Sequence, residues 1–387
     1  MLFSQKLKYI QNAFKLFLMV IPGLISRKVM GDVWIVTERA DQARDNGYIF
    51  FRFLREKYPE QKTYYIIKKG SGDNEKLKPY GNAIIFNSWK HYFYFCRSSI
   101  HISAHINGCI PEKNPFARRL KPFLGYKDVF IPHGVSYGIS EFCLAKHTRL
   151  DLFVCSGMQE YENVIENYGY RQDQVVCTGF PRLDEWHNNR VKKDQILMMP
   201  TWRLYIAQDS KAQFNKTNFF KHYYSLINNL DLEAFLEEHN LQLIFYLHHE
   251  MRKFVSFFRT NNERITIAYQ DDLDIQKLLK ESVLLITDYS SISFDFAYME
   301  KPVLYYQFDQ EEFHSRQYPK GLFDVEKDGF GPIADDEISL INNIQQSYLN
   351  GFKLEDIYKE RMYNFYVFRD EHNCERVYQE IIKRWPV

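Results

Sequence analysis

Short apolar runs recur along the first half of the chain, and helix-like stretches or polar loops separate them. Runs of this kind, rich in β-branched and aromatic residues, are typical of strands buried in a parallel sheet. In the first half they predict strands at residues 33–37, 63–67, 83–86, 100–103, 128–131, 152–155 and 175–178. Strands that alternate with helices in this way indicate a doubly wound parallel sheet.

The pattern restarts after a charged segment at residues 187–194, which we expect to be a linker. The second half predicts strands at residues 195–199, 241–247, 265–269, 283–286 and 303–306. A chain of 387 residues is long for one hydrophobic core, so two domains are expected. We predict an α/β protein with Rossmann-like domains at residues 31–188 and 189–355, and a substrate cleft between them. Helices at residues 356–387 are expected to return to the first domain.

Composition narrows the classes of function. Lys and Arg together number 50 and Asp and Glu 49, so the net charge of +1 gives no reason to expect a nucleic acid partner. The six cysteines are scattered without a C-x-x-C pair, which favours reduced thiols in a cytosolic protein over a zinc site or a disulfide framework. Asp272 and Asp274 precede a predicted helix at residues 275–281, where capping is favoured over metal binding. No metal site is therefore predicted.

Residues 1–30 combine basic and apolar side chains. The apolar stretch 16–25 is interrupted by Pro22-Gly23 and is too short to span a bilayer, and no signal-peptide cleavage site follows it. One interpretation is a basic amphipathic helix that lies on an anionic membrane surface. The other is a helix that packs on the protein's own surface. The sequence leaves both open.

The segment 282–309 carries the most informative pattern. Ser290 and Ser291 follow the predicted strand at 283–286 and precede a predicted helix at 292–299. Parallel sheets bind ligands at the carboxyl ends of their strands, and hydroxyl groups beside the unpaired N–H groups of a helix start suit a phosphate. The alternative is that one serine caps the helix and Asp295 supports its first turn.

Four further loops follow predicted strands and hold basic or hydroxyl side chains: His133, Arg182, Thr201 with Arg203, and His248. Arginine offers a planar fork to phosphate oxygens, and histidine can donate to a phosphoryl oxygen or take up a proton near neutral pH. Such a set suits a pyrophosphate. His249 is the weaker candidate of its pair. Because the chain contains neither G-x-x-x-x-G-K-[ST] nor G-x-G-x-x-G, a P-loop kinase or a simple dinucleotide enzyme is not expected.

These segments resemble the CDP-glycerol glycerophosphotransferase family, the teichoic-acid primases and polymerases and their capsule-synthesis relatives. The resemblance extends over about residues 38–332 and is carried by PHG, TGFPRLD, PTWR, the LH of FYLHHE, and LLITDYSSISFDFAYMEKPVLYY. There are two departures. This chain has PHGVSYG where many members have Trp-His-Gly-Thr-Pro-Leu-Lys, and it has His248-His249 where they have His-Pro.

The resemblance implies a GT-B architecture, with two Rossmann-like domains facing across a cleft, at the cytoplasmic face of the membrane. It implies transfer of glycerol phosphate from CDP-glycerol to a membrane-linked, lipid-linked saccharide or polymer acceptor, with release of CMP and without a cofactor. His133 and His248 would be catalytic, with His133 as the base. The implied substrate-binding residues are Gly134, Val135, Ser136, Arg182, Thr201, Trp202, Arg203, Leu247, Ser290, Ser291 and Asp295. The alternatives are transfer of ribitol phosphate or a sugar, and a non-catalytic scaffold in a membrane assembly.

Overall fold

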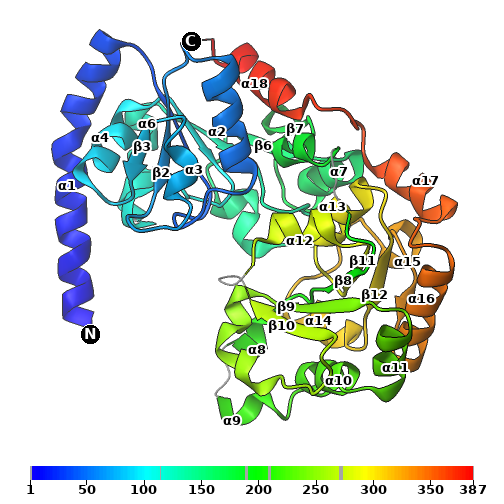
Figure 1. Cartoon of the computed structure of the whole chain (residues 1–387). Coiled ribbons are helices and arrows are strands. Elements are labelled where there is room, and N and C mark those ends of the chain that lie inside the picture. Colours follow the sequence, from blue (N-terminus) through cyan, green and yellow to red (C-terminus); the bar gives the residue numbers. More distant parts are fainter. Residues whose placement is uncertain (1, 114, 188–190, 208–210, 270–272, 387) are drawn as a thin grey trace. The chain divides into compact units, whose positions relative to one another are not determined.

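The computed structural model describes residues 2–113, 115–187, 191–207, 211–269 and 273–386 (Figure 1). It consists of two compact units. The N-terminal unit comprises Met1–Ser136, Glu141–Glu185 and Asp370–Val387, and the C-terminal unit comprises Tyr137–Ser140 and Trp186–Arg369. Part of the expected linker at 187–194 and Asp272 lie outside the described residues.

The N-terminal unit is built on a seven-stranded parallel sheet in the order β3-β2-β1-β4-β5-β6-β7. Its strands are β1 (Trp34–Thr37), β2 (Thr63–Ile67), β3 (Ala83–Ile85), β4 (Ile100–Ser103), β5 (Lys127–Phe130), β6 (Leu152–Cys155) and β7 (Val175–Cys177). Its helices are α1 (Leu2–Met30), α2 (Asn46–Lys57), α3 (Asn74–Leu77), α4 (Trp89–Arg97), α5 (Pro115–Arg119), α6 (Lys121–Leu124), α7 (Met158–Glu166) and α18 (Asn373–Arg384). Short 3₁₀ helices are Pro111–Lys113, Glu141–Cys143, Ala145–His147, Gln172–Gln174 and Pro181–Glu185.

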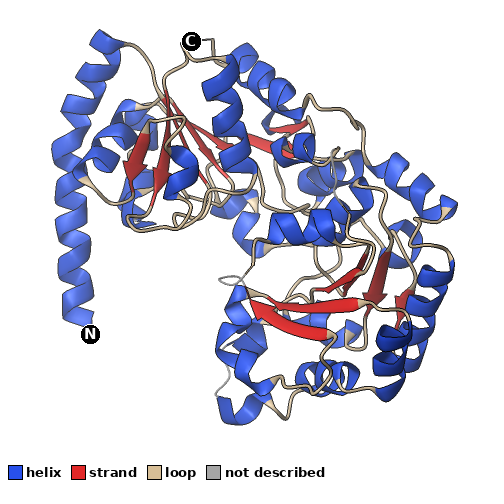
Figure 2. Cartoon of the chain, in the orientation of Figure 1, coloured by secondary structure: helices blue, strands red, loops and turns tan. Residues whose placement is uncertain are grey.

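Helices lie on both faces of this sheet (Figure 2). Alternate side chains of the strands pack against the two layers. Ile35 and Ile66 share a core with Phe95 of α4. Their neighbours point the other way, where Tyr65 contacts Phe51 of α2 and Trp34 contacts Tyr378 of α18. Burial on both faces explains why the strands appear in the sequence as continuous apolar runs.

The C-terminal unit repeats this architecture with six parallel strands in the order β10-β9-β8-β11-β12-β13. Its strands are β8 (Gln195–Met198), β9 (Gln242–Leu247), β10 (Ile265–Tyr269), β11 (Leu284–Thr287), β12 (Val303–Tyr306) and β13 (Ile333–Ala334). Its helices are α8 (Leu204–Ala207), α9 (Lys211–Phe214), α10 (Asn218–Ile227), α11 (Leu230–Glu238), the 3₁₀ helix His249–Phe257, α12 (Ile275–Glu281), α13 (Ile292–Tyr298), α14 (Gln310–Arg316), α15 (Val325–Asp328), α16 (Glu337–Leu349) and α17 (Asp356–Phe365).

Both sheets reverse their strand order at one point, between β1 and β4 in the first and between β8 and β11 in the second. This order is typical of Rossmann folds, which bind ligands beside the reversal, at the carboxyl ends of the strands. The predicted α/β class with two Rossmann-like domains is confirmed. The sequence analysis predicted no helix at Pro115–Arg119, where the structure has α5.

The two C-terminal helices belong to different units. Helix α17 packs in the C-terminal unit, where the ring of Phe365 lies 4.8 Å from that of Phe294 in α13. Helix α18 belongs to the N-terminal unit because Asp184 caps it: the carboxylate accepts hydrogen bonds from the backbone N–H groups of Asn373 and Cys374, each at 2.9 Å. Only α18 therefore lies where both helices were expected.

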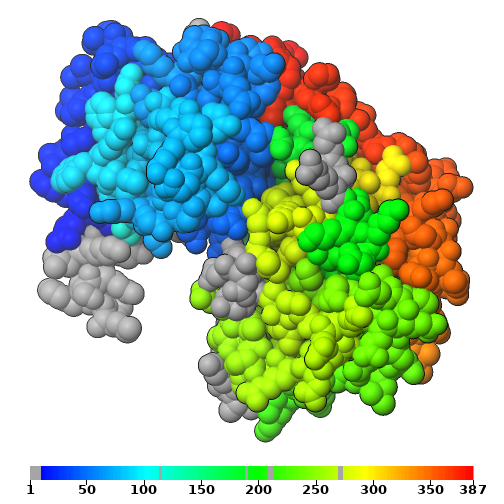
Figure 3. Space-filling model, viewed as in Figure 1, coloured from blue at the N-terminus to red at the C-terminus, as the bar shows by residue number. Residues whose placement is uncertain are grey.

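Helix α1 has two distinct faces. Leu16, Val20 and Gly23 pack inward, with Gly23 against Cys96 of α4, and the Arg27 guanidinium donates to the carbonyl oxygens at the end of α4 and of α6. Helix α1 lies at the surface of the N-terminal unit (Figure 3). Its other face carries a row of exposed large apolar side chains: Ile10, Phe14, Phe17, Leu18, Ile21 and Ile25. Among the described helices, none combines the length and hydrophobicity needed to cross a bilayer.

We expect Asp184→Ala to lower the free energy of unfolding by about 1–2 kcal/mol, because the start of α18 loses its capping carboxylate. Amide hydrogen exchange in α18 should accelerate, and mass spectrometry of peptides from this helix measures it. Asp335→Ala is the control, since Asp335 is an exposed residue of the C-terminal unit. Equal exchange rates in the two variants would show that Asp184 does not hold the helix.

Candidate active site

The loops after β8 and β11 meet at the point where the strand order of the second sheet reverses. The backbone N–H of Thr201, in the first loop, donates to Oδ1 of Asp288 in the second at 2.7 Å. The same carboxylate oxygen accepts the N–H of Tyr289. The PTWR and TDYSS segments are therefore joined at the place where a Rossmann fold binds its ligand.

A buried ionic network fixes these loops. The Arg203 guanidinium donates to both carboxylate oxygens of Asp309, at 2.9 and 3.0 Å, and lies 2.9 Å from Asp288. Asp309 follows β12, so the network links the ends of three neighbouring strands. Burial alone would lower the pKa of Arg203, but the two carboxylates outweigh it and hold that pKa well above its ordinary value.

Two of the residues expected to bind substrate are fully enclosed. Arg203 has no exposed surface, because its charge is compensated by Asp288 and Asp309 inside the protein. Leu247 ends β9 within the hydrophobic core. Both residues can position the loops that follow them, but neither side chain presents a surface to a substrate.

The two serines differ in their surroundings. The Ser290 hydroxyl accepts the N–H of Ile292 at 3.4 Å, and the Ser290 carbonyl accepts the N–H and the hydroxyl of Ser293. Ser291 is the capping residue of α13, yet its side chain makes no capping hydrogen bond in the described structure. Both serines are partly exposed, whereas Asp295 is buried in the first turn of α13. Ser290 thus serves as a cap, and Ser291 is the hydroxyl that helix capping does not use.

His248 and Trp202 come together from separate loops. Their rings are nearly parallel, with an interplanar angle of 10° and centroids 5.8 Å apart. Nδ1 of His248 accepts the N–H of Glu250 at 3.3 Å, which leaves the proton of the neutral ring on Nε2. An imidazole held in this tautomer can donate a hydrogen bond to a phosphoryl oxygen. The neighbouring His249 lies 2.9 Å from the Glu250 carboxylate.

Tyr137 also contributes to the C-terminal unit, although the sequence prediction did not single it out. Its hydroxyl donates to the backbone carbonyl of Tyr289, and its ring contacts Phe294 and Phe323. Tyr137 lies in the PHGVSYG run, which is one of the two departures from the family pattern. That departure was the feature of the sequence that could have pointed to Tyr137.

In the N-terminal unit, His133 follows β5 and is exposed. Its ring hydrogen-bonds to the backbone carbonyl of Ala104 and stacks on His105, with centroids 4.7 Å apart and an interplanar angle of 24°. The protein atoms around the ring lower the pKa of His133, the Asp45 carboxylate opposes this, and the Arg182 guanidinium adds to it. The net shift is downward, so the imidazole is mainly neutral at neutral pH.

The backbone of the His133 loop is held at several points. Asn46 of α2 donates to the Pro132 carbonyl at 2.6 Å, and Arg182 donates to the His133 carbonyl at 2.9 Å. The Ser136 N–H donates to Glu160 at 2.6 Å. Arg182 is buried and also pairs with Asp45 at 3.1 Å. We expected Arg182 to contact the substrate, but the structure places it beneath the loop, where it holds the His133 backbone.

The remaining residues of this loop differ in exposure. Val135 is buried, whereas Gly134 and Ser136 are partly exposed. Ser136 has both backbone groups engaged, because its carbonyl accepts the side-chain amide of Asn163 at 2.7 Å. The loop therefore presents mainly His133 and Gly134 to a substrate.

The reversal point of the first sheet carries a different chemistry. The buried Glu38 carboxylate, directly after β1, accepts the backbone N–H groups of Arg44, Asp45 and Tyr48 at the start of α2. Burial raises the pKa of Glu38 to about 8, the Asp45 carboxylate adds to the rise, and these donors oppose it. A carboxylate of the chain itself thus occupies the helix start that binds phosphate in many Rossmann domains.

Two other features lie outside this arrangement. Asp274 caps α12 through the N–H groups of Gln276 and Lys277, and the described residues contain no cluster of His, Cys, Asp or Glu suited to a metal ion.

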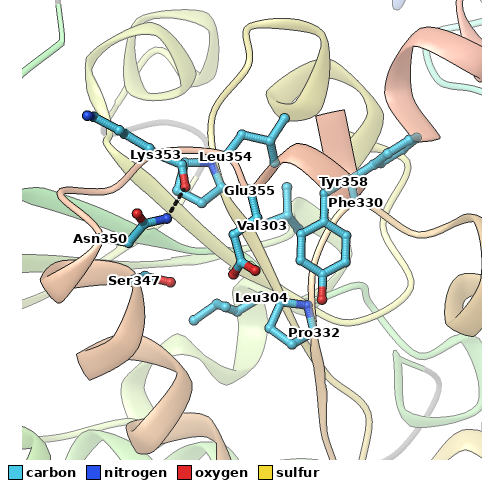
Figure 4. Close-up of a pocket in the computed structure, with 11 residues that line it drawn as sticks. Val303, Leu304, Phe330, Pro332, Ser347, Asn350, Lys353, Leu354, Glu355 and Tyr358 are labelled. Carbon is cyan, nitrogen blue, oxygen red and sulfur yellow. Dashed lines mark hydrogen bonds between the residues drawn. The ribbon is translucent and has the colours of Figure 1, made fainter. Parts of the chain in front are cut away.

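A small hollow of the C-terminal unit lies at the start of β12, beside Val303, Pro332 and Tyr358 (Figure 4). It is at the amino edge of the parallel strands, opposite to the loops of the site, and no predicted site residue in the described ranges lines it.

Known proteins show the family to which this chain belongs. The sequence model for CDP-glycerol:poly(glycerophosphate) glycerophosphotransferase matches residues 24–383. The chain belongs to this family. Among the relatives, the minor teichoic acid biosynthesis protein GgaB of Bacillus subtilis is 30% identical, over 91% of this chain and 40% of that protein. The teichoic acid poly(glycerol phosphate) polymerase of the same organism is 24% identical, over 97% of this chain and 52% of that protein. The chain therefore spans about half of the length of these family members.

Solved structures support the fold. The wall teichoic acid polymerase TagF superposes with a TM-score of 0.67 at 14% identity, covering 100% of this chain and 98% of that chain. The UDP co-structure of S. aureus MnaA superposes with a TM-score of 0.56 at 12% identity, covering 91% and 96%. At such identities the likeness shows the shared architecture of two Rossmann-like domains.

We expect Arg203→Met to lower the free energy of unfolding by about 3–5 kcal/mol, because it leaves two buried carboxylates without their counter-charge. Urea denaturation followed by tryptophan fluorescence measures the change. Lys277→Met is the matched control, since Lys277 pairs with Glu281 at the surface and its loss should cost less than about 1 kcal/mol. Equal effects of the two substitutions would rule out a central role for the network.

Proposed function

We propose that the protein transfers glycerol phosphate from CDP-glycerol to the hydroxyl group of a membrane-linked saccharide or polymer end, and releases CMP. The product would be a teichoic-acid-like or capsular polymer. Family membership supports this reaction class. The observation that carries the proposal is the set of partly exposed residues with donor groups at the reversal point of the second sheet: Trp202, His248, Ser290 and Ser291. The Thr201 hydroxyl beside them is buried without a hydrogen-bond partner among the described residues.

The donor substrate is assigned to the C-terminal unit. There the loops offer hydroxyl groups and the Nε2–H of His248, which suit the oxygens of a diphosphate. In the N-terminal unit, the side chain of Glu38 already accepts the N–H groups at the equivalent helix start that a phosphate would need. This difference supports the acceptor as the substrate of the N-terminal unit.

In the proposed reaction, an acceptor hydroxyl oxygen bonds to the phosphorus next to glycerol. The bond from that phosphorus to the bridging oxygen of the diphosphate breaks, and CMP leaves with its electron pair. His133 takes the hydroxyl proton, for which its exposed and mainly neutral imidazole is suited.

Charge on the leaving CMP would be offset by His248 and by the hydroxyl groups of Ser290 and Ser291. Arg182, Arg203 and Asp295 would position the loops of the site, because all three are buried. No step of the proposed reaction uses a metal ion.

CDP-ribitol competes with CDP-glycerol as the donor in the proposed reaction. The relatives include both glycerol-phosphate and ribitol-phosphate enzymes, among them the ribitol-phosphate polymerase TarK of Staphylococcus aureus, 24% identical over 57% of this chain and 42% of that protein. CDP-ribitol is therefore the second donor to test.

The membrane contact is assigned to α1. Its exposed apolar row, Ile10, Phe14, Phe17, Ile21 and Ile25, follows the spacing of one helix face, while the opposite face packs on the N-terminal unit. An apolar helix face with basic residues beside it suits an anionic membrane surface. A peripheral position at the cytoplasmic face of the membrane would bring a lipid-linked acceptor within reach.

The purified protein should release CMP from CDP-glycerol in the presence of a lipid-linked acceptor and a metal chelator. We expect His133→Ala to lower kcat roughly 100-fold or more, since the attacking hydroxyl loses its base, and His248→Ala to lower it to a similar extent. His147→Ala, at an exposed position of the N-terminal unit, is the control and should leave turnover unchanged. Full activity of the His133→Ala variant would remove the proposed base, and turnover of CDP-ribitol alone would replace the proposed donor.

Co-sedimentation with vesicles tests the membrane contact. Binding to vesicles that contain phosphatidylglycerol should exceed binding to phosphatidylcholine vesicles, and a Phe14→Ser/Phe17→Ser double substitution should weaken it by roughly tenfold or more. Leu230→Ser removes an equally exposed apolar side chain from α11 and is the control. Unchanged binding of the double variant would exclude α1 as the contact.

A further inference from the structure

His105 occupies a position that the proposed reaction leaves without a role. It follows β4, the strand that pairs with β1 where the order of the first sheet reverses. Ligands of Rossmann folds approach this edge of the sheet. His133 stands at the same edge, after the adjacent strand β5.

The backbone around His105 is tightly fixed. The Ser103 hydroxyl donates to the His105 carbonyl at 2.7 Å, and the His105 N–H donates to the Ser103 hydroxyl at 3.1 Å. The N–H of Gly108 donates to the same carbonyl at 2.9 Å. A β-carbon at Gly108 would lie 2.0 Å from the Ser103 hydroxyl, so this close turn requires glycine. The direction in which the His105 side chain leaves the backbone is therefore set.

Two consecutive residues hold the His133 ring. The Ala104 carbonyl accepts its hydrogen bond, and the His105 ring covers one of its faces with centroids 4.7 Å apart. A hydrogen bond at the edge and a stacked ring at the face together restrict both the tilt and the rotation of an imidazole. When one ring nitrogen donates to a backbone carbonyl, the other nitrogen of the neutral ring is the proton acceptor.

We propose that His105 is a positioning residue for His133: its stacked ring orients the base and shields one of its faces from water. This inference rests on the proposed function. The charged groups that face His133 from the surrounding elements are Asp45, Arg182 and Arg39, and His105 adds an aromatic surface.

Removal of the His105 ring should raise the pKa of His133. Crowding by protein atoms is the main reason that the pKa of His133 is lowered. Without the His105 ring, water reaches the exposed face, and the pKa of His133 rises towards its ordinary value. A base works only when it is deprotonated, so the acid limb of the pH–rate profile should move to higher pH.

Three variants separate a role of the His105 ring from a role of its nitrogen atoms. His105→Ala removes the ring, His105→Phe keeps a ring but no nitrogen, and His147→Ala removes an exposed histidine of the same unit. We expect His105→Ala to lower kcat roughly tenfold without changing KM for CDP-glycerol, and to raise the acid limb by about half a pH unit. His105→Phe should stay within about threefold of the wild-type kcat, and His147→Ala should match the wild type.

The His133 titration, followed by NMR of the histidine ring carbons without substrate, gives a second readout. A higher midpoint in His105→Ala than in His105→Phe supports the proposal even if CDP-glycerol is not the donor, so failure of the function and failure of the inference are distinguishable. Identical midpoints in the wild type and His105→Ala would overturn it. A loss of kcat shared equally by the Ala and Phe variants would also overturn it, because the nitrogen rather than the stacked ring would then matter. If His105→Ala does not fold, the Phe variant decides, since an intact ring must preserve the wild-type midpoint.

Discussion

The pairing of the Arg203 guanidinium with the carboxylates of Asp288 and Asp309 is the constraint on which the loops of the C-terminal unit depend. Each of the three residues follows a different strand, so the network sets the relative positions of three loops at one edge of the sheet. Burying these charges is costly, and replacing them by apolar side chains could leave the protein equally stable. Their value lies in geometry: the same carboxylate that binds Arg203 also fixes the backbone of Thr201 and Tyr289, directly before the serine pair.

The two units share one strand order but use its reversal point differently. In the second sheet, the neighbouring loops leave hydroxyl and imidazole groups partly exposed. In the first sheet, Glu38 accepts the N–H groups at the start of α2. The exposed imidazole there is that of His133, which follows the next strand, β5. A helix start whose N–H groups already donate to the chain's own side chain lacks the donors that a diphosphate would need. Identical topology is thus compatible with separate roles in binding, and the loops rather than the fold determine the chemistry.

The sequence predicted the sheets well and the orientation of side chains poorly. The boundaries of β2, β4, β10 and β12 agree with the predicted runs to the residue, because β-branched and aromatic residues buried on both faces leave an unambiguous pattern. The loops of the site were also found, since each follows such a strand. The burial of Arg182 and Arg203 was not predictable, because their carboxylate partners lie far away in the sequence. The stacking of His105 on His133 likewise requires knowledge that β4 and β5 are neighbours.

The division of the chain bears on how such proteins can diversify. Tyr137–Ser140 belongs to the C-terminal unit and Asp370–Val387 to the N-terminal one, so neither unit is encoded by one uninterrupted stretch of a gene. A truncation after Glu185 would deprive one half of the helix that Asp184 caps, and the other of the tyrosine bound to the Tyr289 carbonyl. Recombination between relatives at a single crossover would combine mismatched pieces in both halves. Inheritance of the chain as a whole is therefore favoured over the exchange of separate modules.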